Sequence, residues 1–121
     1  PNRGVRFGAS SHVARFLLTV REYDADQQFA INCRFDADIE AALSALDGPV
    51  AEFDRDAEPD SVKAVEGSTM QWGARQAVES TDGVPVAVID RGEVGKEAIV
   101  KLLAPDAETL VDRVCAVHDA L

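Results

Sequence analysis

The apolar residues of the chain change several times between a helical spacing and a strand spacing. A stripe at i, i+3, i+4 and i+7 predicts a helix over 11–22, for which Ser10 or Ser11 would be the N-cap. Residues 29–35 alternate between apolar and polar, which is the period of a β-strand. The further predicted elements are a helix from the cap Asp36 to Gly48-Pro49, a strand over 50–53, a helix over 69–79, strands over 84–89 and 98–103, and a last helix that begins at Pro105-Asp106.

Strands that alternate with helices indicate an α/β fold. We expect a layered α/β/α domain with a mixed sheet of about four to six strands and about four helices. The continuous apolar run 84–89 suits a central strand that is covered on both faces. The acidic stretch 54–67 has no clear period, so we expect a long loop there. Ligands of such folds bind at loops that follow the carboxyl ends of strands, which selects the polar loops 8–12, 32–34, 54–58, 67–73 and 90–97.

Several side chains are expected to face the core. Cys33 and Cys115 are too few and too far apart for a zinc site, so we expect two buried, reduced thiols. His118 is expected at the surface. The inner face predicted for the last helix consists of Leu110, Val111, Val114, Val117 and Leu121.

Length and composition limit the class of protein. The 121 residues suffice for one domain, 1–121, with its own core. No apolar run approaches the roughly 20 residues that span a bilayer, and no signal peptide is visible, so we expect a cytoplasmic protein without membrane contact. Because the chain starts with Pro1 rather than Met, we expect the C-terminal part of a longer chain.

The chain is strongly acidic. Its 22 Asp and Glu exceed its 12 Lys and Arg, which gives a net charge of −10. Such a surface repels the phosphates of DNA and RNA, so direct nucleic-acid binding by this domain is not expected. Abundant Asp with only three Lys favours a haloarchaeal source with salt-dependent stability, and an ordinary acidic domain is the alternative.

The best candidate for chemistry is the segment at the start of the first predicted helix, Gly8-Ala9-Ser10-Ser11-His12. Glycine allows a sharp turn, and a helix that begins there directs free N–H groups and the positive end of its dipole outward. Two hydroxyls and an imidazole add donors, so the segment suits a phosphate. The alternative is that a serine merely caps the helix.

Three further polar clusters follow predicted strands or begin a helix. In 90–97, glycines flank Arg91 and Lys96, whose natural partner is a phosphate or diphosphate, and a charged surface turn is the alternative. Asn32 and Arg34 share one face of a strand and could bind a heterocycle or phosphate. Ser68, Thr69, Met70 and Trp72 begin another helix, where a stacking role for the tryptophan competes with a place in the core.

The acidic segment 54–58 offers carboxylates that could hold Mg²⁺ beside phosphate oxygens, although a solvated loop is the simpler interpretation. The histidines have no neighbouring nucleophile in a predicted arrangement, so Ser-His-Asp and Cys-His catalysis are not indicated.

These clusters, in this order, resemble the ThiN family. The matching segments are Phe7-Gly8-Ala9-Ser10-Ser11-His12-Val13-Ala14-Arg15, Ala30-Ile31-Asn32 with Arg34, Asp54-Arg55 with Glu58-Pro59, Ser68-Thr69-Met70 with Trp72-Gly73, and Asp90-Arg91-Gly92 with Gly95-Lys96-Glu97. Members of this family act as thiamine-phosphate synthases when fused to a pyrimidine kinase. Others follow a helix-turn-helix in archaeal repressors of thiamine genes, where the domain senses a thiamine phosphate.

The resemblance implies a ligand site for thiamine phosphate or its pyrimidine and thiazole phosphate precursors. Loops 8–12 and 90–97 would hold the phosphates, and Arg15, Arg55, Arg91 and Lys96 would supply charge. The synthase reaction needs anion binding and stabilisation of a leaving diphosphate rather than a protein nucleophile. Mg²⁺ would be one way to neutralise a bound diphosphate, and no other cofactor is implied.

Two departures from the family pattern bear on whether the domain is an enzyme. Synthases of the family carry Arg four residues before the residue that matches Asn32, where this chain has Gln28, and Ala98 replaces the proline that usually follows the residue matching Glu97. Loss of a cation would slow the release of diphosphate more than it would weaken the binding of a finished monophosphate. We therefore favour a ligand-sensing domain of a helix-turn-helix regulator of thiamine biosynthesis or transport genes; the alternative is an active thiamine-phosphate synthase. The oligomeric state stays open, with a homodimer as one alternative.

Overall fold

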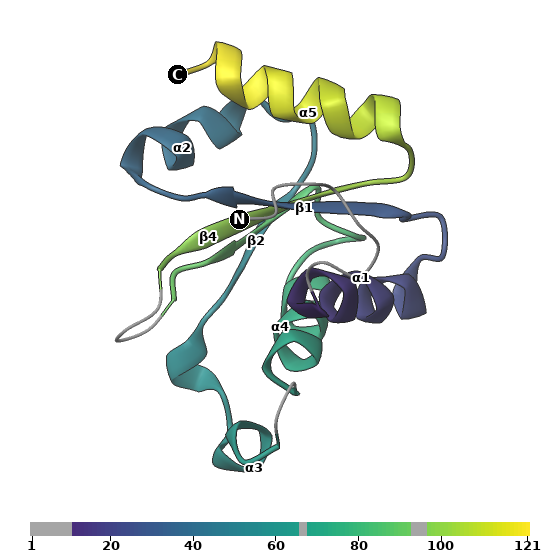
Figure 1. Cartoon of the computed structure of the whole chain (residues 1–121), viewed down its shortest axis with the longest axis vertical. Helices are drawn as coiled ribbons and strands as arrows, with labels where there is room; N and C mark the ends of the chain where they lie inside the picture. Colours follow the sequence, from purple (N-terminus) through teal and green to yellow (C-terminus); the bar gives the residue numbers. More distant parts are fainter. Residues whose placement is uncertain (1–10, 66–67, 93–96) are drawn as a thin grey trace, which may run out of the picture.

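The computed structural model describes residues 11–65, 68–92 and 97–121, apart from the side chain of Ser11, and its centre is one mixed sheet with helices on both faces (Figure 1). Helices α2 and α5 cover one face, α1 and α4 cover the other, and α3 lies beyond α4. In chain order the elements are α1 (Ser11–Tyr23), β1 (Phe29–Arg34), α2 (Ala37–Ala42), the 3₁₀ helix η1 (Leu43–Ala45), β2 (Val50–Phe53), the 3₁₀ helix η2 (Arg55–Ala57), α3 (Asp60–Lys63), α4 (Ser68–Glu79), β3 (Ala87–Asp90), β4 (Ile99–Ala104) and α5 (Ala107–Asp119). The predicted layered α/β/α fold is confirmed.

The strand order brings three carboxyl ends to one edge. The order is β1-β4-β3-β2, in which β4 is antiparallel to both neighbours and β2 is parallel to β3. Strands β1, β2 and β3 therefore run in the same direction and end at Arg34, Phe53 and Asp90. We call this end of the sheet the carboxyl edge.

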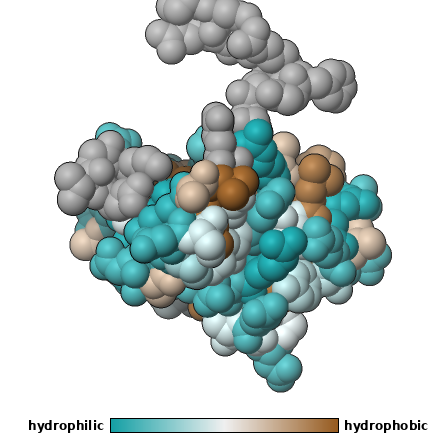
Figure 2. All heavy atoms as spheres, turned by 90° about the horizontal axis from the view of Figure 1, so that it is seen from below, coloured by the Kyte–Doolittle hydropathy of each residue, from teal (hydrophilic) through white to brown (hydrophobic). Residues whose placement is uncertain are grey.

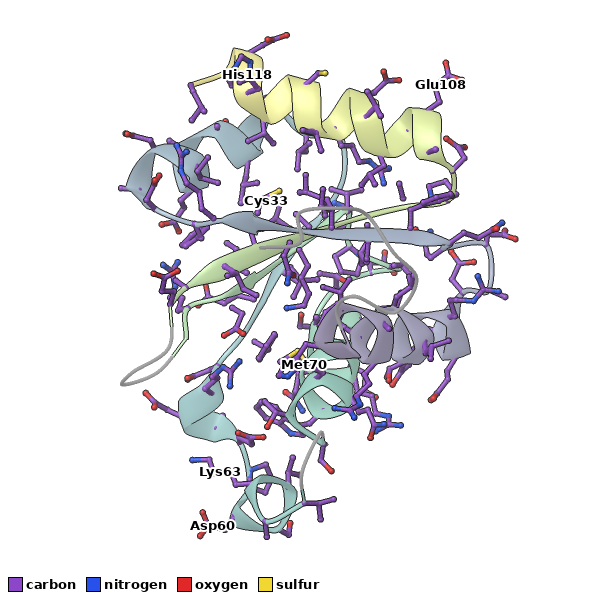
Figure 3. All side chains as sticks on the ribbon, in the orientation of Figure 1. Cys33, Asp60, Lys63, Met70, Glu108 and His118 are labelled. Atoms are coloured by element: carbon purple, nitrogen blue, oxygen red, sulfur yellow. The ribbon has the colours of Figure 1, made fainter. Side chains whose placement is uncertain are left out.

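The core has two halves because successive residues of a strand point to opposite faces. In Figure 3, Met70 of α4 lies between its helix and the sheet, whereas Cys33 lies on the side of α5. The buried residues on the α1/α4 face include Phe16, Val20, Phe53, Met70, Ala74, Ala77, Val88 and Leu103. Those on the α2/α5 face are Ile39, Ala42, Leu43, Ala87, Ile89, Val100, Leu102 and Val117.

Most predicted elements are present with small shifts at their ends. Asp36 and Asp106 cap α2 and α5 as predicted, by accepting hydrogen bonds from the N–H groups of Ile39 and Thr109. The strand predicted over 84–89 begins only at Ala87, and all four of its residues are buried, as a central strand requires. The predicted loop 54–67 was wrong in part, because it contains η2 and α3, both too short to show a period.

The predicted inner face of the last helix was also too wide. Val117 is buried, and Leu110 and Val114 pack against the core, whereas Val111, Cys115 and Leu121 are exposed. The apolar stripe of α5 that faces the sheet is thus narrow. Val111 and Cys115 each follow a stripe residue directly, and the turn of about 100° per residue directs them toward solvent. Cys33 is half-buried and is a free thiol, as is Cys115. His118 is exposed, as predicted.

The surface agrees with the acidic composition. Seen from below the view of Figure 1, from the side of α3, most of the described surface is hydrophilic (Figure 2). Within the described ranges, every helix is too short or too polar to cross a membrane.

The cap of α5 gives a test of local stability. We expect Asp106→Ala to lower the free energy of unfolding by about 1 kcal/mol, because the N–H of Thr109, 2.7 Å from the carboxylate, loses its acceptor. Urea denaturation at pH 7 measures the change. The control is Asp112→Ala, which removes the same charge from the exposed middle of α5 and should leave stability unchanged or slightly higher. Equal losses in both variants would contradict the capping role.

Candidate functional site at the carboxyl edge

The centre of the site is a buried ion pair between the ends of two parallel strands. Asp90 ends β3, its partner Phe53 ends β2, and Arg55 follows two residues later. The guanidinium of Arg55 donates from Nε to Oδ1 of Asp90 at 2.9 Å and from Nη2 to Oδ2 at 2.7 Å. The N–H of Gly92 adds a third hydrogen bond to Oδ1 at 2.9 Å. The side chains of Asp90 and Arg55 are 1% and 10% exposed, so water screens this pair very little.

The surroundings keep Asp90 ionised. Burial alone would raise the pKa of its carboxyl group. Hydrogen bonds from Arg55 and Gly92, together with the charges of Arg55 and Lys101, hold the pKa below its ordinary value. Asp90 is therefore a fixed negative charge that already accepts three hydrogen bonds from the protein.

Lys101 is the second buried cation of the site. It lies in β4 between its register partners Asn32 and Val88, and its side chain runs on the α1/α4 face with no exposure to solvent. Its Nζ lies 5.1 Å from the centre of the Phe16 ring. Within the described part of the chain, this Nζ has no hydrogen-bond partner. Burial lowers the pKa of Lys101 to about 8, although the charge of Asp90 acts in the opposite direction.

A second buried carboxylate connects the end of η2 to helix α4. Glu58 is 7% exposed, and its Oε2 accepts a hydrogen bond of 2.6 Å from Oγ1 of Thr69, in the first turn of α4. This contact fixes the start of α4 relative to the segment that carries Arg55.

Aromatic rings fill the space beneath these polar groups. Phe53 is buried, with its ring centre 6.3 Å from that of Phe16 and 6.2 Å, edge-on, from that of Trp72. The guanidinium of Arg55 lies 5.9 Å from the Phe53 ring, and Gly73 of α4 packs so closely that an added Cβ would lie 2.9 Å from the same ring. The polar groups therefore rest on a dry, close-packed floor.

Two helices begin near the carboxyl edge. The hydroxyl of Tyr23, the last residue of α1, donates to Oε2 of Glu79, the last residue of α4, at 2.8 Å, so the two helices end side by side. Residues 24–28 then turn the chain into β1, which means that α1 runs back along β1 with its first turn toward the carboxyl edge. The contact between Thr69 and Glu58 places the first turn of α4 there too. The positive ends of two helix dipoles thus point to the same region.

The structure brings some of the predicted site residues together. Arg55 is at the centre of the site, Thr69 binds Glu58, and Trp72 is half-buried against Phe53. Met70 belongs to the core, and Ser68 is half-buried at the start of α4. Asn32 is exposed, next to Lys101 across the sheet.

Other predicted residues lie elsewhere. Arg91 is on the α2/α5 side, where it donates to Glu52 at 2.9 Å and to Glu40 at 2.7 Å and lies 5.4 Å from the ring of Phe35. These carboxylates raise its pKa above the ordinary value. The structure therefore separates Arg91 from the Asp90–Arg55 pair, and phosphate binding by Arg91 stays a prediction.

The remaining predicted site residues are exposed, lie at the start of α1 or fall outside the described residues. Arg34 is exposed and pairs with Asp36 at 3.3 Å, and both Arg15 and His12 are exposed on α1. Ser11 starts α1. The other predicted residues, Gly8, Ala9, Ser10, Gly95 and Lys96, lie outside the described residues.

Two of the predicted Mg²⁺ ligands, Asp54 and Glu58, form hydrogen bonds within the protein. Asp54 accepts a hydrogen bond from the N–H of Asp56, and Glu58 binds Thr69. Over residues 11–65, 68–92 and 97–121, no three His, Cys, Asp or Glu side chains form a group that could hold a metal ion.

Lys101 was not predicted as a site residue, and neither Asp90 nor Glu58 was predicted to take part in a buried charge cluster. The signal for Lys101 was a single lysine in the apolar run 98–103, where a charge has to be compensated. Asp90 and Glu58 appeared only within charged loops, and nothing in the sequence distinguished them from the solvated carboxylates beside them.

The sequence is similar to a known family and to known proteins over most of its length. A family model described as "Thiamine-phosphate synthase ThiN" matches residues 1–116. The thiamine-phosphate synthase ThiN of Methanothermobacter thermautotrophicus is 35% identical over 105 residues, which are 87% of this chain and 55% of that protein. The bifunctional thiamine biosynthesis protein ThiDN of Methanocaldococcus jannaschii is 34% identical over 110 residues, 91% of this chain and 25% of that protein. The chain thus spans about half of the first relative and a quarter of the second.

Among solved structures, the C-terminal domain of a phosphomethylpyrimidine kinase is similar with a TM-score of 0.88 and 28% identity. The match covers 93% of this chain and 63% of that one. The fold described above is therefore also found in that kinase's C-terminal domain.

Burial of the Asp90–Arg55 pair predicts that loss of the Asp90 charge strongly destabilises the fold. Asp90→Asn should lower the free energy of unfolding by about 3 kcal/mol, because Arg55 stays buried without its counter-charge. The control is Glu52→Gln, which removes the same charge from an exposed pair with Arg91 and should cost less than about 1 kcal/mol. Urea denaturation at pH 7 compares the two, and similar losses would contradict the importance of burial.

The pH dependence follows from the lowered pKa of Asp90. Its contribution to stability is fully present above the pKa of an unfolded Asp, about 4, and is lost as the pH falls through the lower folded value. Acid unfolding of Asp90→Asn should therefore lack this part of the decline, and an unchanged acid profile would argue against it.

Proposed function

Because the chain belongs to the ThiN family, we propose that it is a thiamine-phosphate synthase domain. It would join hydroxymethylpyrimidine diphosphate to a thiazole phosphate and release diphosphate. The observation that carries this proposal is the carboxyl edge, where Arg55 and Lys101 are buried beneath two helix N-termini in a chain of net charge −10. A concentration of positive potential in an acidic protein suits an anionic substrate.

The reaction requires little covalent chemistry from the protein. The bond between the pyrimidine methylene carbon and diphosphate breaks, the thiazole nitrogen forms the new bond to that carbon, and diphosphate leaves. A protein assists by holding both phosphates and by stabilising the negative charge that develops on the leaving group. The first turns of α1 and α4 offer N–H groups, and the fork between Arg55 and Asp90 keeps a guanidinium in place.

The aromatic floor supports the same proposal. Phe16 and Phe53 keep water from the underside of the polar groups, so electrostatic interactions there are stronger than in bulk solvent. A reactive pyrimidine cation would also be protected from attack by water on this side.

The ligand-sensing alternative rests mainly on Gln28. The backbone N–H of Gln28 donates to the carbonyl of Ala104 at the amino end of β1, whereas Asp90 and Arg55 lie at the carboxyl edge. The family's arginine at the position of Gln28 would thus lie at the other end of the sheet from Asp90 and Arg55. Its replacement by Gln28 therefore removes no cation from the surroundings of that pair. The names of both curated relatives refer to thiamine biosynthesis, which also favours the enzyme over a regulator.

The proposal is tested by mixing the chain with both synthase substrates and measuring thiamine phosphate by phosphorus NMR, in dilute buffer and in molar salt. We expect turnover, and we expect Arg55→Lys to lower it by about 10- to 100-fold, because an ammonium cannot form the two-point contact with Asp90 and the cation shifts.

A matched control is Arg75→Lys, which changes an exposed residue of α4 that pairs with Glu22 and should keep normal turnover. Unfolding curves check that both variants are folded. Binding of thiamine phosphate without any turnover would support the sensing alternative, and binding of no ligand at all would overturn both.

A further inference from the structure

We propose that the ammonium group of Lys101 binds a phosphoryl oxygen of the substrate. This inference rests on the proposed function and adds a specific residue to it. The first observation is that Nζ of Lys101 is completely buried and, among the described residues, has no hydrogen-bond partner.

An unpaired ammonium in a protein interior is unfavourable, so its presence calls for a compensating group. Asp90 cannot serve fully, because its oxygens already accept from both nitrogens of the Arg55 fork and from Gly92. The ring of Phe16 faces the ammonium but accepts no strong hydrogen bond. The ammonium of Lys101 therefore has no hydrogen-bonded counter-charge among the described residues.

The unpaired ammonium identifies the class of ligand. A buried ammonium that has no hydrogen-bond acceptor among the described residues favours an anion that supplies one. A phosphoryl oxygen accepts several hydrogen bonds and would satisfy the free N–H groups of an ammonium. The dipoles of α1 and α4 favour negative charge in the same region.

The geometry also provides a direction of approach. Asn32, the register partner of Lys101 in β1, is exposed, and Arg55 is 10% exposed on the opposite side of β4. The flexible four-carbon stem of lysine allows the ammonium to turn toward a ligand that arrives beside Asn32. The exposed amide of Asn32 would contact the same ligand.

Proton uptake follows from the surroundings of Nζ. The charged groups that face it are Asp90 on β3 and Arg55 in η2, while α1 presents the ring of Phe16 and β1 the neutral amide of Asn32. Burial lowers the pKa of Lys101 to about 8, so some of the unliganded molecules lack the proton near that pH. An anion next to Nζ raises that pKa, so binding near pH 8 is accompanied by proton uptake.

The test is calorimetric titration with thiamine monophosphate, with thiamine and with inorganic diphosphate, at pH 8 in two buffers of different ionisation enthalpy. We expect Lys101→Met to weaken the binding of thiamine monophosphate by about 10- to 100-fold and the binding of thiamine by less than about threefold. Only thiamine monophosphate offers phosphoryl oxygens to the ammonium. The wild-type chain should take up protons at pH 8 and far fewer at pH 6.5, and Lys101→Met should take up none.

The control is Lys63→Met, which removes the same charge from an exposed residue of α3, a helix that lies apart from the sheet (Figure 3), and should bind normally. Lys101→Met should fold at least as stably as wild type, because it removes an unpaired buried charge. If it does not fold, Lys101→Gln is titrated in the same way, with the same expected result.

The outcomes separate this inference from the proposed function. Unchanged binding by Lys101→Met, or equal weakening of the binding of thiamine and of its phosphate, would overturn the role of Lys101 alone. Lys101-dependent binding of diphosphate without binding of thiamine monophosphate would support the anion site and contradict the proposed function. Binding of none of the three probes would contradict both.

Discussion

The ion pair between Asp90 and Arg55 determines how the carboxyl edge is built. Its two partners come from segments 35 residues apart in sequence, and burial makes each dependent on the other, since either alone would be an uncompensated charge. By holding Arg55, the pair fixes η2, and η2 leads directly to Glu58, which binds the first turn of α4. The position of α4 over the sheet, and with it the aromatic floor of the site, thus follows from one interaction.

The alternation of side chains along the strands divides the basic residues into two kinds. Arg91 points to the α2/α5 side and is matched by two glutamates, which makes it a compensated and structural charge. Lys101 points to the α1/α4 side and is matched by no direct partner in the described chain. An acidic protein keeps most of its cations neutralised in this way, so an unmatched buried cation stands out as a place for an anionic ligand.

The secondary structure could be predicted because its causes are local. Apolar spacing located α1, β1 and α4 within a residue or two, and Asp36 and Asp106 identified the starts of two helices through the backbone N–H groups that they cap. The short helices η2 and α3 escaped prediction because fewer than two turns cannot display a period. Cys115 was placed inward because its small apolar side chain is compatible with either side of the narrow stripe on α5.

The sequence by itself determined the class of fold, the order of its elements and the family. It also led us to expect a phosphate ligand and a role for Arg55, and both stay predictions. The tertiary structure alone decided which charges are compensated. Asp90 and Lys101 are 11 positions apart in the chain, yet their relationship depends on β3 pairing with β4, on the face to which each residue points and on the distance of Arg55 from a different segment. Whether a charge is paired or unpaired depends on distances of a few ångströms between such segments, and no local pattern in the sequence carries that information.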